Sequence, residues 1–272
     1  MKPNFYFRGF LCLLLVFIFH TSNAADYYWI GGSGDWSDIS HWATAPNGTI
    51  THSQSPTAND DVYFNFSSFD APGQVVSLST DIIFCRSMNW AGVANNPTLE
   101  GSANVTISIY GSLSLDPNMD FNFAGKILFT GNQTDNTINL GTHTAGKDVI
   151  FSGMGAWTLT NGILVDSAFI FNEGTLNTDG QNIDCQYFDS RSSAQRTLNL
   201  GASIFTIRGA TINASNGELN DAVIPSLRLN AENLDMNPGS SLFILTAEET
   251  DLWMEGPGDI NFNRVVVMSP SG

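Results

Sequence analysis

Few side chains in this 272-residue sequence suggest acid/base chemistry, and the most suggestive motif is Asn177-Thr178-Asp179-Gly180. An Asn-Thr-Asp string can supply one carboxylate of a polysaccharide-cleaving site. General acid hydrolysis needs at least two carboxyl groups flanking the bond, however. In a polysaccharide-cleaving site of this kind, an Asp-Asp pair shortly downstream, a Gly-His-Gly and an Arg-x-Lys would complete the acid/base cluster. The sequence contains none of the three. We therefore interpret residues 177–180 as a structural turn and predict no catalytic residue and no enzymatic activity.

Metal ligation is the second chemistry to consider. The oxygen ligands that could hold Ca²⁺ are Asp35, Asp38, Asp60 and Asp61. Asx residues at strand entrances more often form turns than metal sites. The histidines after residue 24 have neither His-x-x-x-His spacing nor Cys neighbours, which argues against zinc; they are His41, His52 and His143. We predict no metal and no cofactor.

Tryptophans near the N-terminus offer a third chemistry, the stacking of sugar rings on aromatic faces. The candidates for glycan stacking are Trp29, Trp36 and Trp42, and Trp90 follows them. The alternative is burial, because the first coil of a solenoid must be covered and large aromatic side chains do this well. We favour the capping core and keep the glycan platform as the alternative.

The first 24 residues predict a secretory signal peptide. Lys2 and Arg8 precede an apolar run, and small residues at Ser22 and Ala24 predict cleavage near Ala24 and Ala25. The apolar run is far shorter than the roughly 20 residues of a spanning helix, and we expect no membrane span after cleavage. We therefore predict a protein that is secreted or held at the outer cell surface.

Charge limits the partners of the mature chain. Cleavage removes two of the ten basic residues and none of the 26 acidic ones, which leaves a formal charge of −18. Nucleic acid is an unsuitable partner, since phosphate backbones are bound by clustered Lys and Arg. Surface glycans and other cell-surface proteins remain as expected partners.

Two cysteines remain in an oxidising compartment, Cys85 and Cys185. On a solenoid of about 21-residue coils they lie about five coils apart, which exceeds the reach of a disulfide. We predict two buried or half-buried free thiols.

Repetition of short apolar segments indicates the fold. Strand-like segments recur without helical period, and they are 74–79, 81–85, 105–110, 126–130, 148–152, 157–160, 167–171, 197–200 and 203–208. Residues 127–131 (ILFTG) match 149–153 (VIFSG), and 137–141 (TINLG) match 197–201 (TLNLG). A period near 21 in short strands predicts a parallel β-helix whose Asn side chains can form hydrogen-bonded ladders.

Glycines recur with a similar period at 111, 131, 153 and 174; the slot near 195 is empty, and 217, 239 and 258 follow. The predicted fold is an all-β, right-handed parallel β-helix with a Trp-rich N-terminal cap, and a tandem β-sandwich is the alternative. We expect a signal peptide at 1–24, the Trp-rich cap and first coils at 25–100, and the solenoid at 101–272.

The segment from Tyr28 to Trp42 (YWIGGSGDWSDISHW), followed by Pro56 and Asn59 to Phe64, resembles the opening of large secreted repeat proteins of Bacteroidetes. Residues 156–165, 174–183 and 196–207 are similar to the β-helical body of the same proteins. The resemblance implies an adhesin-like exoprotein exported by type IX secretion with a C-terminal sorting domain.

The sequence departs from that pattern at its C-terminus, since it stops after the strand-like segment 264–267 without a sorting domain. We expect the chain to be the N-terminal part of a longer protein, or a truncated product. The predicted function is a non-catalytic structural or adhesin-like segment, a stalk or adhesive part of a larger exoprotein. The alternative is a carbohydrate-binding or polysaccharide-degrading β-helix.

Overall fold

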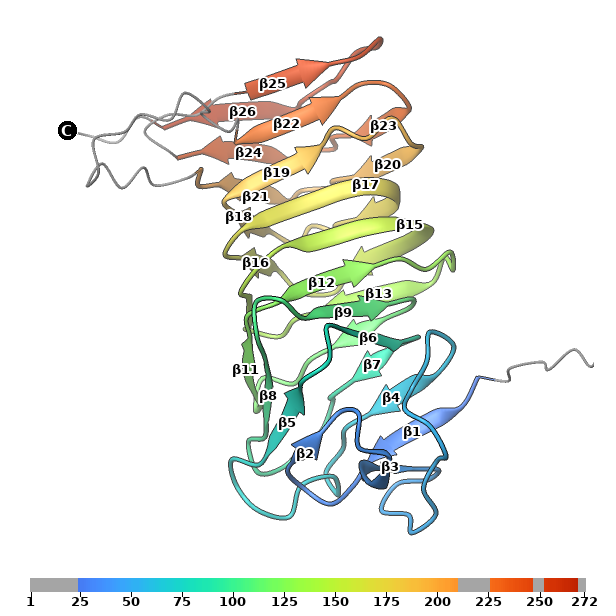
Figure 1. Cartoon of the computed structure of the whole chain (residues 1–272). Coiled ribbons are helices and arrows are strands. Elements are labelled where there is room, and N and C mark those ends of the chain that lie inside the picture. Colours follow the sequence, from blue (N-terminus) through green and yellow to red (C-terminus); the bar gives the residue numbers. More distant parts are fainter. Residues whose placement is uncertain (1–23, 210–225, 247–251, 269–272) are drawn as a thin grey trace, which may run out of the picture.

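The protein is a parallel β-solenoid of about eight turns, as the computed structural model shows for residues 24–209, 226–246 and 252–268 (Figure 1). Named strands pair in parallel throughout the described residues except for β1 (Asp26–Trp29) with β3 (Trp42–Ala43). The predicted parallel β-helix is therefore confirmed. The tandem sandwich is wrong, because its hairpins would have given antiparallel ladders. The predicted signal peptide, residues 1–24, lies outside the described residues except for Ala24.

The strands of successive turns form three stacks, which we call the first, second and third faces. The first face contains β6 (Ile82–Cys85), β9 (Thr106–Ile109), β12 (Lys126–Phe129), the start of β15 (Val149–Leu159), the start of β17 (Ala168–Asn177), β19 (Tyr187–Ser190), β22 (Leu227–Asn230) and β25 (Leu252–Glu255). The second face contains β1, β4 (Asp61–Tyr63), β7 (Met88–Asn89), β10 (Leu113–Ser114), β13 (Asn136–Asn139), the ends of β15 and β17, β20 (Arg196–Asn199) and β23 (Leu234–Asn237).

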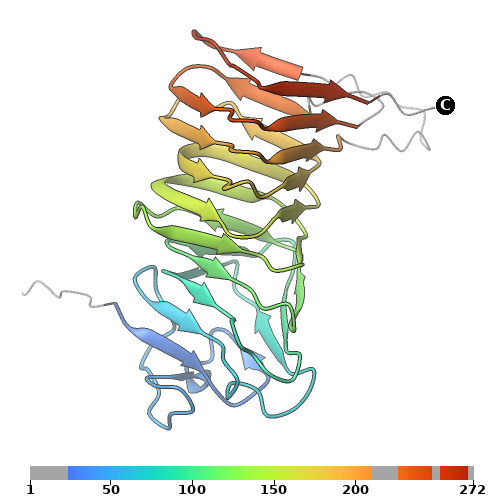
Figure 2. The same ribbon diagram turned by 180° about the vertical axis from the view of Figure 1, so that it is seen from behind.

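The third face consists of two sheets. They can be followed in Figure 2, where the molecule is turned by 180° from Figure 1. The N-terminal sheet contains β2 (Gly34–Asp35), β5 (Val75–Leu78), β8 (Thr98–Gly101) and β11 (Asp120–Phe123). The C-terminal sheet contains β14 (Thr144–Ala145), β16 (Ile163–Val165), β18 (Ile183–Cys185), β21 (Ile204–Ile207), β24 (Leu242–Leu245) and β26 (Arg264–Val267). Because β8 pairs with both β5 and β11, the stack continues across residue 100.

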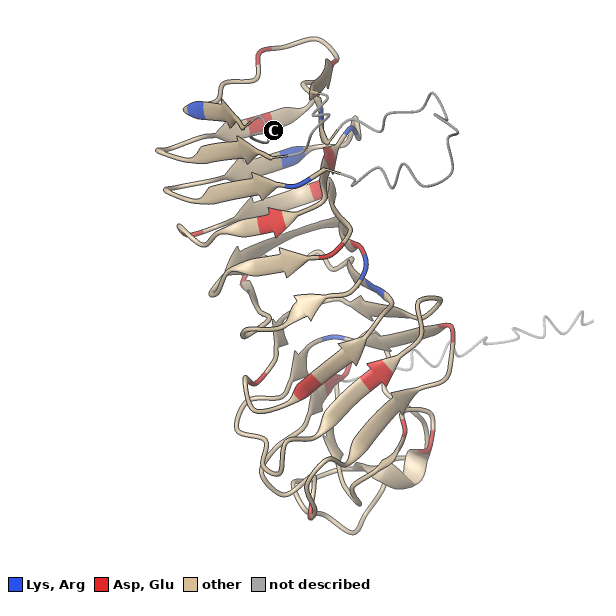
Figure 3. Cartoon of the chain, turned by 90° about the vertical axis from the view of Figure 1, so that its left-hand side faces the viewer, with Lys and Arg blue, Asp and Glu red and all other residues tan. Residues whose placement is uncertain are grey.

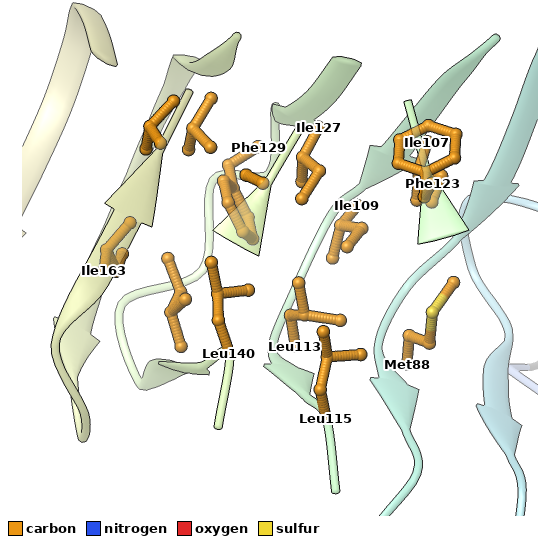
Figure 4. Packing of buried hydrophobic residues seen from close by; sticks show 14 of the residues in the cluster. Met88, Ile107, Ile109, Leu113, Leu115, Phe123, Ile127, Phe129, Leu140 and Ile163 are labelled. Atoms are coloured by element: carbon orange, nitrogen blue, oxygen red, sulfur yellow. The ribbon is translucent and has the colours of Figure 1, made fainter. Parts of the chain in front are cut away.

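The core follows from the two-residue period of a strand, which sends alternate side chains inward. In β12, Ile127 and Phe129 are buried while Lys126 and Leu128 are partly exposed. Buried aliphatic and aromatic side chains from successive turns pack on one another inside the solenoid, as Figure 4 shows for the central turns. The matched strings at 127–131 and 149–153 lie directly on one another, with Phe129 and Phe151 as Cα partners.

Glycines line the corner between the first and second faces because the backbone of the preceding turn comes very close there. A Cβ at Gly131 would lie 1.7 Å from the Tyr110 carbonyl oxygen, and one at Gly153 would lie 2.2 Å from that of Gly131. In the next turn Gly174 pairs with Arg196, which fills the empty slot near position 195. The spacing was misleading further on: Gly239 contacts Gly201 at a different corner, and position 217 lies outside the described residues.

The N-terminal end of the stack is closed by an antiparallel segment. Residues 39–41 form a single 3-10 turn, η1 (Ile39–His41), whose N-cap Asp38 accepts a hydrogen bond from the Ser40 backbone N–H. This turn leads into β3, which pairs with the outer edge of β1 (Figure 1). The outer edge of β1 is therefore covered by β3, a later strand of the same chain.

Candidate functional site

The outer surface of the second face carries a regular array of polar side chains. Side chains of adjacent turns lie in register and form one line along the solenoid, the polar column, which consists of Asp61, Ser87, Ser112, Thr137, Thr158, Asn177, Asn199 and Asn237. A parallel, adjacent column consists of Tyr28, Tyr63, Asn89, Ser114 and Asn139. Both columns exist because every second residue of these short strands points away from the core.

Asparagines at the C-terminal half of the polar column are joined by side-chain hydrogen bonds. Asn177 Nδ2 donates to Thr158 Oγ1 at 3.3 Å, Asn199 Nδ2 to Asn177 Oδ1 at 2.5 Å, and Asn237 Nδ2 to Asn199 Oδ1 at 2.7 Å. The predicted Asn ladder is confirmed. The amides of Asn177 and Asn199 both donate and accept along the axis, and that of Asn237 donates, so the ladder reinforces the backbone hydrogen bonds between turns.

A pair of tyrosines heads the adjacent column at the N-terminal end. The rings of Tyr28 and Tyr63 stack with centroids 5.0 Å apart and planes 17° from parallel. Burial, and then the negative charges of Asp61 and Asp26, raise the pKa of Tyr63 to about 12. Both hydroxyls are therefore neutral hydrogen-bonding groups at neutral pH, because the pKa of Tyr28 is raised as well, chiefly by burial.

Beside the tyrosines, Asp61 and Arg86 form a bidentate ion pair. Arg86 Nε donates to Asp61 Oδ1 at 2.7 Å, and Arg86 Nη2 donates to Asp61 Oδ2. The hydrogen bonds and charge of Asp61 raise the pKa of Arg86. A shallow hollow of about 230 Å³ opens next to this pair, lined by Asp61, Tyr63, Asn89, Ser114, Thr137 and four neighbours. The end of the second face thus combines aromatic, amide, hydroxyl and charged groups.

The tryptophans that the sequence offered as a glycan platform lie inside the cap. Trp29, Trp36 and Trp42 are 0, 3 and 0% exposed. Trp29 and Trp42 meet edge to face at 5.0 Å, Trp36 and Trp42 at 4.8 Å, and Phe64 stacks on Trp90 at 3.7 Å. Protein atoms cover the ring faces, so these tryptophans form the capping core and present no face to a sugar in this structure.

The Asn-Thr-Asp-Gly string forms a turn at the end of β17. Asp179 and Gly180 have positive φ angles of 50° and 78°. Thr178 is fully buried, and its hydroxyl donates to the Leu200 carbonyl oxygen at 2.8 Å. Asn177 belongs to the polar column, so these side chains point in different directions and serve the turn and the ladder.

The acidic residues considered for Ca²⁺ are occupied by protein donors. Asp35 accepts from the Ser37 backbone N–H at 2.8 Å, and Asp38 from the Ser40 hydroxyl at 2.7 Å. Asp60 accepts from Thr57, and Asp61 pairs with Arg86. Within residues 24–209, 226–246 and 252–268, no group of three or more His, Cys, Asp or Glu side chains is arranged to hold a metal ion.

The three histidines each form a hydrogen bond with a backbone carbonyl oxygen: His41 with Ile30, His52 with Asp26 and His143 with Asp116.

Cys85 and Cys185 are both buried free thiols, as predicted. Burial raises the pKa of both, that of Cys185 to about 12. The described part of the chain holds no helix with the length and apolarity needed to cross a membrane.

The candidate site residues that sequence reasoning missed are Tyr28 and Tyr63, whose rings stack on the second face. The signal in the sequence was the recurring string Asp-x-Tyr at 26–28 and 61–63, whose residues lie in register. The described residues hold six ion pairs, and most of the ribbon in Figure 3 is neither acidic nor basic. Comparisons of the chain with protein-family models, with curated proteins and with solved structures found no match.

Proposed function

We propose that this chain is a non-catalytic secreted or cell-surface protein of the adhesin-like kind, in which the solenoid serves as a stalk or adhesive segment of a larger exoprotein. The observation that carries the proposal is the Asn ladder on the second face. It joins four successive turns by side-chain hydrogen bonds, in addition to the backbone pairs. Such a stack resists bending and shear between turns, which a stalk requires.

The composition of the outer wall supports neutral partners. The columns of the second face carry Ser, Thr and Asn over most of their length, while the mature chain has a formal charge of −18 from its 26 acidic and eight basic residues. Polyanionic partners are repelled by this charge. Neutral surface glycans and uncharged protein surfaces fit it better.

A carbohydrate-binding β-helix is the second candidate, and the Tyr28–Tyr63 pair favours it. Tyr28 and Tyr63 are both partly exposed and lie in one column with Asn89 and Ser114, beside the hollow. Aromatic rings with adjacent amides and hydroxyls are suited to neutral sugars. A degrading enzyme would need a second carboxylate near Asp61, and Asp26 is its register partner.

A glycan array combined with a reducing-sugar assay tests these functions. The stalk proposal predicts no release of reducing sugar from neutral or acidic polysaccharides. Binding of neutral glycans that Tyr63→Ala abolishes and Tyr110→Ala leaves unchanged would assign adhesion to the tyrosine pair; Tyr110 is a matched control on another surface. Release of sugar that Asp26→Asn abolishes would contradict a non-catalytic role.

A further inference from the structure

Asp60 is a buried carboxylate that lies beside Ala25, directly before the first strand. The residue is 4% exposed. Its Oδ1 accepts from the Ala25 backbone N–H at 2.9 Å, and its Oδ2 accepts from the Thr57 backbone N–H at 2.9 Å and the Thr57 hydroxyl at 2.6 Å. No Lys, Arg or His of the described ranges forms an ion pair with it. A buried charge without a cation is costly.

Ala25 is held on both sides, unlike the residue before it. Its carbonyl oxygen accepts from the Asp61 backbone N–H at 3.0 Å, and its methyl group packs against the core. Ala24 is exposed, and β1 begins directly after Ala25 at Asp26. The boundary between solvent and fold therefore falls at the Ala24–Ala25 peptide bond.

We propose that a processing peptidase hydrolyses the Ala24–Ala25 bond and that the new α-ammonium of Ala25 pairs with the buried Asp60 carboxylate. Water adds across the C–N bond, so that Ala24 leaves as a carboxylate and the Ala25 nitrogen takes up protons to become an ammonium. The donor that already lies 2.9 Å from Asp60 Oδ1 thereby gains a positive charge. Cutting after Ala25 instead would remove both the donor and the Asp61 contact.

This inference rests on the proposed export of the chain, and it adds a function for Asp60. Processing would supply the missing cation to the N-terminal cap, so the cap would reach full stability only after the leader is removed. A free α-amino group ordinarily has a pKa of about 7.7–8.0. A buried carboxylate raises the pKa of a neighbouring amine, so the stabilisation is fully present below pH 8 and is lost as the pH rises through the raised value.

Other titratable groups surround the site and must be separated from it. They are Tyr27, whose pKa is raised by burial and then by Asp60, together with Asp26, Asp61, Arg86 and His52. For this reason the α-amino group is best titrated directly, by NMR of the isotopically methylated amine, on the full exported chain.

We expect mass spectrometry of the exported protein to give a chain that begins at Ala25, with an α-amino pKa above about 9 against the usual 8. Asp60→Asn should return that pKa to about 8, and Asp26→Asn, which alters an exposed carboxylate next door, should keep it raised. If Asp60→Asn does not fold, α-acetylation of Ala25 in the wild-type chain serves instead, and should increase the unfolding equilibrium constant at pH 7 at least tenfold.

Two results would overturn the inference in different ways. An exported chain that keeps its leader, or begins elsewhere, refutes the processing site. A chain that begins at Ala25 but has an ordinary α-amino pKa refutes the ion pair and leaves export standing.

Discussion

The two ends of the solenoid treat the same kind of side chain in opposite ways. At the N-terminal end, β3 pairs with the outer edge of β1, and Trp29 and Trp42 are fully buried. At the other end, no strand of the described ranges pairs with the outer edge of β25, and Trp253 is 44% exposed. Burial in a stacked fold therefore depends on having a turn on each side, and not on hydrophobicity alone.

Replacing tryptophan by alanine at each end tests this difference and should give the largest effect. Trp42→Ala removes a fully buried ring from the aromatic cap and should lower the free energy of unfolding by about 3–5 kcal/mol. Chemical denaturation followed by circular dichroism measures it. Trp253→Ala is the matched control and should cost less than about 1 kcal/mol, because its ring is exposed. Equal losses would contradict the comparison.

Arg196 tests the turns between the ends. Its guanidinium is buried and donates to four backbone carbonyl oxygens. Two of them, from Ser190 and Ala194, lie in the same turn as Arg196, and the other two, from Asn230 and Glu232, lie in the next turn. The side chain therefore bridges two turns. Arg196→Leu would leave these acceptors unpaired and should cost about 2–4 kcal/mol in the free energy of unfolding. Arg191→Leu changes a partly exposed arginine nearby and should cost under about 1 kcal/mol. A neutral Arg196→Leu would show that the guanidinium does not hold the turns.

The Asn ladder allows an inside position to be compared with an end position. Asn199→Ala removes two ladder hydrogen bonds, one to Asn177 and one from Asn237, and should cost about 1–2 kcal/mol. Asn237→Ala removes one and should cost about half as much. Thermal unfolding of both variants gives the ratio. The ladder would carry no stability if both variants unfolded like the parent protein.

Labelling of the two native thiols compares the N-terminal half of the solenoid, which contains Cys85, with the C-terminal half, which contains Cys185. It requires no substitution. Burial raises the pKa of Cys85 and Cys185, so both should resist alkylation in the folded protein at pH 8. Denatured, non-reduced protein should take up two labels. Because Cys185 lies nearer to β25, whose outer edge has no partner strand among the described residues, it should label faster than Cys85 under native conditions, as peptide mass spectrometry would show. Faster labelling of Cys85 would place the less stable end at the cap.

Much of this comparison could be predicted from sequence. The strand segments from 74–79 to 203–208 all overlap observed strands, although 148–152 and 157–160 belong to the single strand β15, and the matched strings at 127–131 and 149–153 gave the register of two turns. They succeeded because the inward residues of stacked turns must repeat in type to fill one core.

The register over longer distances could not be predicted in this way. The strings at 137–141 and 197–201 suggest that Thr137 and Thr197 share a column, but Thr137 instead stands over Asn199, through Thr158 and Asn177. The three spacings along this column are 21, 19 and 22 residues, which places the register partner of Thr137 two residues beyond Thr197, and a shift of two keeps the same side chains outward. Likewise, the missing glycine near position 195 did not indicate that a buried arginine lies there. Arg196 is held by backbone carbonyl oxygens, which every residue has, so the sequence gives no sign of its partners.

Paired cysteines on the second face test the stacked register most directly. Residues Thr158 and Asn177 are Cα partners on adjacent turns, about 4.8 Å apart, which is within the reach of a disulfide. The account predicts that Thr158→Cys combined with Asn177→Cys forms a disulfide under mild oxidation, whereas Thr158→Cys combined with Thr175→Cys does not. The opposite pattern would contradict the parallel stack on which the proposed stalk depends.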